Sequence, residues 1–148
     1  MDEKGDKFVI GVESIDDDHK ALFSAVEDLK SAMDGKAEAR EMGALLHRLA
    51  EATGKHFASE ESLMREAKYP GLALHQANHQ RLMEKLHAFV ARHGRSGAQL
   101  DHYALNFLRD WLVFHVENDD QRLGDWLRDR ARDLARAQSQ AQGAVQSA

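Results

Sequence analysis

The stretch His56-Phe57-Ala58-Ser59-Glu60-Glu61 places an imidazole and a carboxylate four residues apart in a segment of strong helix formers. Residues at this spacing lie one turn above each other on an α-helix, so His56 and Glu60 share one face. After a break at Tyr69-Pro70-Gly71, the next helical segment opens with His75-Gln76-Ala77-Asn78-His79, a second pair at the same spacing. Two consecutive helices therefore present groups that can bind a metal ion.

The composition restricts both the class of protein and the kind of site. The 148 residues include no Cys, which excludes disulfides, thiolate catalysis, iron–sulfur clusters and cysteine zinc sites. A net charge of −5 argues against nucleic acid as the main partner, because binding a phosphate backbone requires a basic surface. No run approaches the roughly 18 apolar residues of a membrane span. We therefore expect a cytoplasmic protein without membrane insertion, whose metal ligands are nitrogen and oxygen atoms.

Apolar periodicity and the scarcity of Pro predict an all-α fold of four amphipathic helices. The first follows a predicted N-cap at Asp16 and ends at Asp34-Gly35. Its apolar stripe advances in steps of three and four residues and is formed by His19, Leu22, Val26, Leu29 and Met33. The second helix spans about 37–66, the third about 75–93, and the fourth begins near residue 98 and continues, alone or through a further short helix, to about residue 135.

Short connections between these helices indicate an up-down-up-down four-helix bundle. Residues 1–15 lack helical periodicity but include Ile10 and Val12, so we expect an N-terminal arm laid across the bundle. The apolar pattern persists beyond residue 120 and predicts a C-terminal helical extension. We assign residues 1–137 to one bundle domain and expect residues 138–148, rich in Ala, Gln, Ser and Gly, to form a disordered tail.

Seven potential metal ligands fall on the inner faces of the four predicted helices: His19, His56, Glu60, His75, His79, His115 and Asp120. A single histidine on such a face is more often hydrogen-bonded in the core than bound to a metal. Five imidazoles and two carboxylates without a metal would instead face desolvation costs of several kcal/mol for the charged groups alone.

The number of ligands exceeds that of one zinc site and suits two ions. An imidazole-rich set favours iron, copper, nickel or zinc over magnesium or calcium. If both carboxylates bridge two six-coordinate ions and one oxygen atom also bridges them, one coordination position stays open for a small molecule.

These residues resemble the hemerythrins, in particular the single-domain bacterial hemerythrins. The resemblance spans about residues 8–127 and rests on four motifs: Ile15-Asp16-Asp17-Asp18-His19-Lys20, the stretch from His56 to Met64, Tyr69-Pro70 followed by His75 and His79, and Trp111-Leu112-Val113-Phe114-His115 followed by Asp120. It implies a non-haem di-iron centre in a four-helix bundle. One iron is then held by His75, His79 and His115, the other by His19 and His56, and Glu60 and Asp120 bridge them.

The spacing between His115 and the carboxylate that follows it leaves two candidates. At about 100° per residue, Asp119 aligns with His115 on a regular α-helix, whereas Asp120 lies about 140° away. The resemblance selects Asp120, which requires local unwinding or a π-type turn near Glu117-Asn118. Asp119 is the alternative.

The resemblance also implies reversible O2 binding, as in an oxygen carrier, store or delivery protein. Leu22, Trp111, Leu112 and Val116 match the family's apolar O2 pocket, whose walls keep out water and protons and so favour release of O2. Five histidines against two carboxylates favour a carrier over an enzyme, because ferritin-like di-iron sites use more carboxylates. The alternatives are an O2-dependent sensor and a di-iron oxidase, peroxidase or nitric-oxide-handling enzyme. Beyond O2 itself, the expected partner is an O2-consuming enzyme or a signalling protein.

Overall fold

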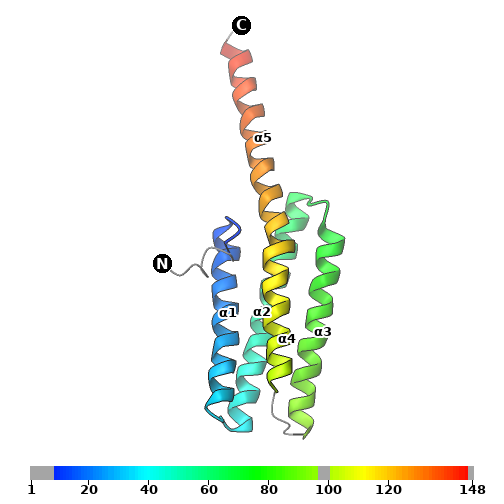
Figure 1. The fold of residues 1–148 in the computed structure, drawn as a ribbon. Coiled ribbons are helices and arrows are strands. Elements are labelled where there is room, and N and C mark those ends of the chain that lie inside the picture. The colour runs from blue at the N-terminus through cyan, green and yellow to red at the C-terminus, as the bar shows by residue number, and fades with distance from the viewer. Residues whose placement is uncertain (1–8, 97–100, 147–148) are drawn as a thin grey trace.

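The computed structural model describes residues 9–96 and 101–146, and these ranges are helical apart from the N-terminal arm and short connections. Helices α1 (Glu13–Asp34), α2 (Ala39–Ala67), α3 (Leu72–Ser96) and α4 (His102–His115) run alternately up and down (Figure 1). A π-helical turn, η2 (Val116–Asp120), joins α4 to α5 (Gln121–Gln146), which continues in the same direction. This confirms the predicted all-α four-helix bundle with a C-terminal helical extension. Of the arm predicted over residues 1–15, residues 9–12 precede the bundle, residues 13–15 belong to α1, and residues 1–8 lie outside the described residues.

The N-terminal arm is fastened to the first turn of α1 by Asp16. The prediction of Asp16 as the N-cap is wrong, because α1 already begins at Glu13 and Val12 occupies the cap position. The Asp16 carboxylate instead accepts hydrogen bonds from the backbone N–H groups of Ile10 (2.7 Å) and Gly11 (3.2 Å). Asp16 therefore bonds to backbone N–H groups of the arm and not to those of the helix end, and the local sequence pattern used to assign an N-cap does not include these donors.

Ile10 anchors the arm at the junction of the bundle with α5. Its side chain is fully buried in a small apolar cluster with Ile15, Met64 and Leu123. A Cβ atom at Gly124 would lie only 2.6 Å from the Ile10 carbonyl oxygen, so the close approach of the arm to α5 requires glycine there. Arg128 completes the attachment by donating from Nη1 to the same carbonyl oxygen, at 2.7 Å.

The turn between α2 and α3 brings their ligand-bearing ends together. Lys68 adopts a left-handed conformation with φ of 57° and ends α2. The backbone N–H groups of Lys68 and Tyr69 bond to the carbonyl oxygens of Arg65 (3.1 Å) and Met64 (2.9 Å). Pro70 follows and cannot continue the helix. The chain therefore reverses at once, and the start of α3 lies beside the end of α2.

Along the axis of the bundle, one apolar cluster lies on each side of the candidate ligands. The larger cluster includes Leu22 of α1 and Leu112 of α4, and the smaller includes Ile15 of α1 and Leu123 of α5. His19 lies between Ile15 and Leu22 in α1, just as Asp120 lies between Leu112 and Leu123. The candidate ligands thus form a polar layer between two apolar layers.

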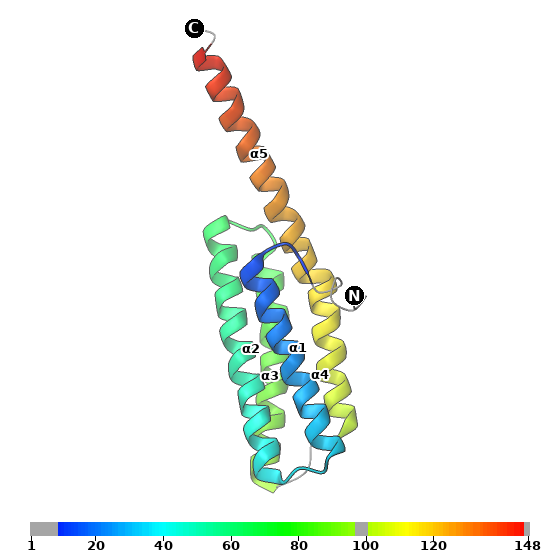
Figure 2. The ribbon, with the colours of Figure 1, turned by 90° about the vertical axis from the view of Figure 1, so that its left-hand side faces the viewer.

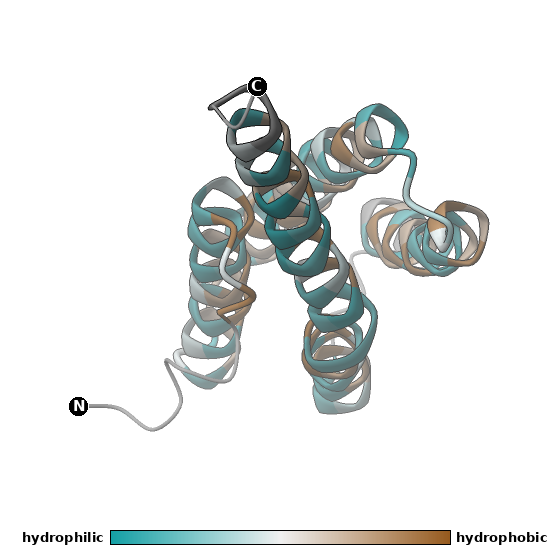
Figure 3. Cartoon of the chain, turned by 90° about the horizontal axis from the view of Figure 1, so that it is seen from above, coloured by the Kyte–Doolittle hydropathy of each residue, from teal (hydrophilic) through white to brown (hydrophobic). Residues whose placement is uncertain are grey.

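The C-terminal part of α5 leaves the bundle as a single helix (Figures 1 and 2). Residues 131–143 are all exposed, and seen from above this part of the helix is largely hydrophilic (Figure 3). We expected no regular structure from residue 138, whereas α5 continues to Gln146. The segment contains no Pro and is rich in Ala and Gln, which are good helix formers, so nothing in it ends the helix. Among the described residues, no helix is long and apolar enough to span a membrane.

Candidate metal centre

All seven predicted ligands lie together in the core, and each is at most 4% exposed. They form two groups, in each of which every residue offers one ligand atom and these atoms all lie within 4.8 Å of one another. The larger group contains Glu60, His75, His79, His115 and Asp120, and the smaller contains His19, His56, Glu60 and Asp120. The two groups therefore share both carboxylates and differ in their histidines.

Glu60 directs one carboxylate oxygen to each group. Its Oε1 lies 2.6 Å from Nε2 of His75 and 3.3 Å from Nε2 of His79, both in the larger group. Its Oε2 lies 3.1 Å from Nε2 of His56, in the smaller group. Glu60 thus stands between the two sets of imidazoles, as a bridging carboxylate must.

Asp120 divides its oxygens in the same way. Its Oδ1 lies 2.9 Å from Nε2 of His75 and 3.1 Å from Nε2 of His115, while its Oδ2 lies 2.8 Å from Nε2 of His19. The π-helical turn over Val116–Asp120 turns this side chain inward and confirms the π-type turn that the spacing requires. The alternative carboxylate, Asp119, lies on the other side of His115, with its Oδ2 2.8 Å from Nδ1.

Within the described part of the chain, His56, His79 and His115 also have a carboxylate at their outer nitrogen. The pairs are His56 with Asp18 at 2.9 Å, His79 with Glu61 at 3.3 Å, and His115 with Asp119 at 2.8 Å. Sequence reasoning missed all three roles. The spacing of four residues between His115 and Asp119 could have indicated their contact from the sequence. The contact between Asp18 and His56 could not be predicted in this way, because it depends on the packing of α1 against α2.

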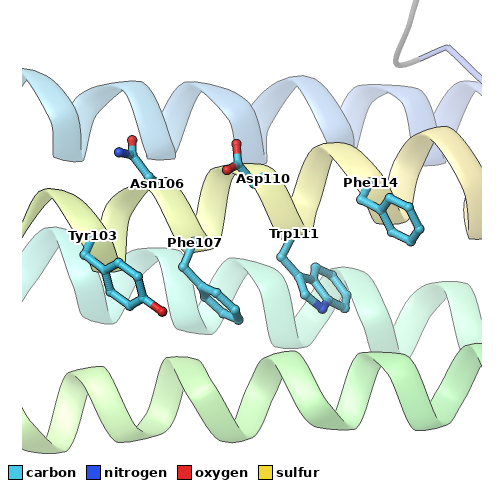
Figure 4. A pocket seen from close by; sticks show the side chains of 6 residues that line it. All are labelled: Tyr103, Asn106, Phe107, Asp110, Trp111 and Phe114. Atoms are coloured by element: carbon cyan, nitrogen blue, oxygen red, sulfur yellow. The ribbon is translucent and has the colours of Figure 1, made fainter.

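The predicted pocket residues are apolar neighbours of the histidine-rich layer. Leu22, Leu112 and Val116 are buried members of the larger apolar cluster, and Trp111 is partly buried against it. The Trp111 ring stacks on His115, with centroids 4.6 Å apart and planes inclined by 17°. On the outside of α4, Trp111 also lines a surface groove of about 560 Å³ whose other walls are the side chains labelled in Figure 4.

Phe57 is a neighbour of the site that sequence reasoning did not single out. Its ring stacks on His79, with centroids 3.7 Å apart and planes inclined by 5°, and lies 5.8 Å from the ring of His115. It immediately follows His56, and no helical spacing relates it to His79 of the next helix. Phe57 and Trp111 thus cover the faces of two imidazoles of the larger group.

Several polar atoms in this layer make no hydrogen bond of regular geometry within the described part of the protein, although they lie at ion-pair distances from one another. They are Nε2 of His56, both carboxylate oxygens of Glu60, Nε2 of His75 and Oδ1 of Asp120. Buried polar atoms are rarely left in this condition, because each costs free energy of desolvation. Imidazole nitrogens and carboxylate oxygens that converge without hydrogen bonds fit a site for cations.

Without a metal, the carboxylates and imidazoles stabilise each other's charged forms. Burial disfavours the charge of Glu60, yet its contacts with His56, His75 and His79 outweigh this and lower its pKa to about 2. Burial likewise opposes charge on His75, but Asp120 and Glu60 raise its pKa to about 9. For His115 burial is again outweighed, here by Asp119 and Asp120, and the pKa is raised to about 9.

The metal-free protein is therefore expected to lose stability as the pH rises from 6.5 to 9. The raised pKa values of His75 and His115 contribute stability that is complete below 6.5 and is lost as the pH approaches 9. Each pKa unit corresponds to about 1.4 kcal/mol. The lowered pKa of Glu60 matters at acidic pH. Its contribution to the stability of the fold is present above pH 4.5 and is lost as the pH falls toward 2.

Metal binding should show the opposite dependence, because it requires neutral imidazoles and releases their protons. Thermal unfolding between pH 6.5 and 9 at constant ionic strength, with and without Zn²⁺, measures both effects. The midpoint of the metal-free protein should fall, and the increase caused by Zn²⁺ should grow. A metal-free midpoint that rises over this interval would contradict the assigned ion pairs.

Comparison with known proteins relates the whole bundle to one family. Residues 10–127 match the family model described as the hemerythrin HHE cation binding domain. Myohemerythrin of Sipunculus nudus is 33% identical over 115 residues, which cover 78% of this chain and 84% of the relative. Bacteriohemerythrin of Methylococcus capsulatus is 31% identical over 122 residues, covering 82% and 92%. A crystal structure of a wild-type hemerythrin superposes with a TM-score of 0.76 at 30% identity, over 84% of this chain and 95% of that chain.

Proposed function

Because the chain belongs to the hemerythrin family, we propose that it binds two iron ions and, through them, O2 reversibly. In this proposal one ion is held by His75, His79 and His115 and the other by His19 and His56. Glu60 and Asp120 serve both. The protein then acts as an oxygen carrier, store or delivery protein, and its partner is O2.

The observation that carries the proposal is the division of the two shared carboxylates. Glu60 and Asp120 each direct one oxygen to the larger group of imidazoles and the other oxygen to the smaller group. A single ion would need only one group of ligands. Two groups that have different histidines but share Glu60 and Asp120 are instead suited to two ions. Two cations between five nitrogens and two bridging carboxylates would satisfy the buried atoms that otherwise lack hydrogen-bond partners.

The chemistry of the ligands supports iron among the available ions. Imidazole and carboxylate without thiolate disfavour Cu⁺, and the high proportion of imidazole disfavours Mg²⁺ and Ca²⁺. Zinc is usually four-coordinate, so two zinc ions would not use all the nitrogen and oxygen ligands of this set. Two ferrous ions held by these residues would supply the two electrons that reversible binding of O2 requires.

The protein's own side chains supply the conditions for reversibility. Leu22, Leu112 and Val116 exclude water with side chains that are at most 5% exposed. Trp111 and Phe57 cover the faces of His115 and His79 and hold these rings in place. An apolar wall that offers no proton donor limits further reduction of O2 and thereby favours its release.

Metal analysis of protein produced in iron-replete cells tests the two-ion assignment. We expect two irons per chain, and the same value after His87→Ala or His102→Ala, because both residues are exposed and lie outside the two groups. One iron or fewer in protein that still binds O2 would contradict the assignment. Continuous consumption of O2 in the presence of a reductant would favour the enzyme class instead.

A further inference from the structure

The outer carboxylates of the site differ in how firmly each is held. Asp18, which faces His56, has a side chain that is 45% exposed. Glu61 is 17% exposed, but its oxygen lies 3.3 Å from His79. Asp119 combines the shortest separation, 2.8 Å from Nδ1 of His115, with a side chain that is only 13% exposed. It is therefore the outer carboxylate whose interaction is least weakened by solvent.

Asp119 is also held by a residue from another helix. Nδ2 of Asn78, in α3, donates a hydrogen bond to Oδ2 of Asp119 at 3.0 Å. This oxygen is the one that faces Nδ1 of His115. The other oxygen points toward the exposed Arg122, whose Nη1 is 3.9 Å away. The oxygen that contacts His115 is thus fixed from α3 independently of its own turn.

The π-helical turn places two consecutive carboxylates at opposite edges of one imidazole. Oδ2 of Asp119 lies 2.8 Å from Nδ1 of His115, while Oδ1 of Asp120 lies 3.1 Å from Nε2. An ionised carboxylate can only accept hydrogen bonds, so Nδ1 of His115 carries a proton and donates a hydrogen bond to Asp119. In the neutral imidazole Nε2 then keeps its lone pair and points it into the site.

We propose that Asp119, held by Asn78, is a positioning residue that keeps His115 in its Nδ1–H tautomer and thereby strengthens cation binding by the larger group. The inference rests on the proposed function only in requiring that the site binds metal. A carboxylate behind a ligating histidine orients the ring and makes its free nitrogen a better donor to a cation. Asp119 would do this without contacting the cation, whereas the adjacent Asp120 directs its carboxylate into the site.

Three variants separate the parts of this interaction, with a matched control from the same turn. Asp119→Asn keeps an oxygen that accepts from His115 but removes the charge, and Asp119→Ala removes both. Asn78→Ala removes only the hydrogen bond that holds the carboxylate. Glu117→Ala removes an exposed carboxylate from the π-helical turn and is the control.

Titration of the metal-free full-length protein with Zn²⁺ against a competing chelator measures the effect. Loss of such an outer partner typically weakens metal binding by about 10- to 100-fold. We expect a loss in this range for Asp119→Ala at the position that the larger group would provide, smaller losses for Asp119→Asn and Asn78→Ala, and no change for Glu117→Ala. Asp119→Ala with the affinity of the control would overturn the proposal. If Asp119→Ala does not fold, the other two variants decide in the same way.

The hydrogen bond from Nδ1 of His115 to Asp119 provides a second measurement that a purely structural role would not change. Long-range ¹H–¹⁵N correlation spectra of the Zn²⁺-loaded protein should show the His115 proton on Nδ1, protected from exchange with water. Asp119→Ala should lose that protection, and Asp119→Asn should largely retain it. Equal protection in wild type and Asp119→Ala would contradict the inference. A wild type that binds no metal would refute the proposed function instead, so that the two failures are distinguishable.

Discussion

Replacing Glu60 with Ala is expected to reduce the iron content from two ions per chain to one or fewer. Glu60 directs Oε1 to His75 and Oε2 to His56, so the substitution removes one oxygen ligand from each proposed position. It also removes the negative charge that helps to raise the pKa of His75, which leaves uncompensated imidazoles in the core. Loss of an ion is therefore the largest single effect that the geometry predicts.

The measurement is iron per chain after loading and desalting, with Glu66→Ala as the control. Glu66 is an exposed carboxylate of the same helix and should leave the iron content at the wild-type value. Glu60→Gln retains the size and one oxygen of the side chain, yet it cannot provide a charged bridge and is also expected to lose iron. Retention of two irons by both Glu60 variants would show that Glu60 is not a bridging ligand.

Leu112→Asn is expected to keep two irons but to shorten the lifetime of the oxygen-loaded protein. Leu112 lies about one turn before His115 in α4 and is only 5% exposed. A polar side chain there admits water and a proton donor to the apolar wall that Leu22 and Val116 form beside the candidate ligands. The protein should then pass irreversibly to the oxidised form much faster than wild type.

Leu105→Asn is the matched control, because Leu105 is a leucine of the same helix that is 3% exposed and lies about two turns further from His115. Both substitutions bury a polar amide in the same apolar cluster, at a cost of about 1–3 kcal/mol. A general loss of stability should therefore affect both alike. Decay of the oxygen-dependent absorption in air, without reductant, is compared for the two variants. Equal decay rates would exclude Leu112 from the pocket.

Apolar periodicity predicted the four helices and the inward direction of six of the seven candidate ligands, because both depend on the helical repeat alone. His19 stands in the stripe that continues with Leu22 and Val26, and the structure buries all three. Asp120 is different, since a regular helix would turn it away from His115. Its selection came from the resemblance to a family, and the π-helical turn supplies the physical reason.

The features that the sequence did not predict depend on contacts between distant segments. Asp16 satisfies the backbone of the arm instead of the end of a helix, because Ile10 is held in the core beside Gly124. The contact between Asn78 and Asp119 joins residues 41 positions apart, and no local pattern indicates it. Composition alone did not predict the C-terminal end of α5, because a segment rich in Ala and Gln is compatible with a helix as well as with a disordered tail.

The visible spectrum of the iron-loaded protein during repeated exchange between nitrogen and air tests the central claim most directly. After reduction, the protein should develop an absorption band in air, lose it under nitrogen and regain it with similar amplitude over several cycles. The signal should correspond to one O2 for each pair of irons. A protein that carries two irons but develops no band, or that is oxidised irreversibly at the first exposure to air, would contradict reversible binding of O2.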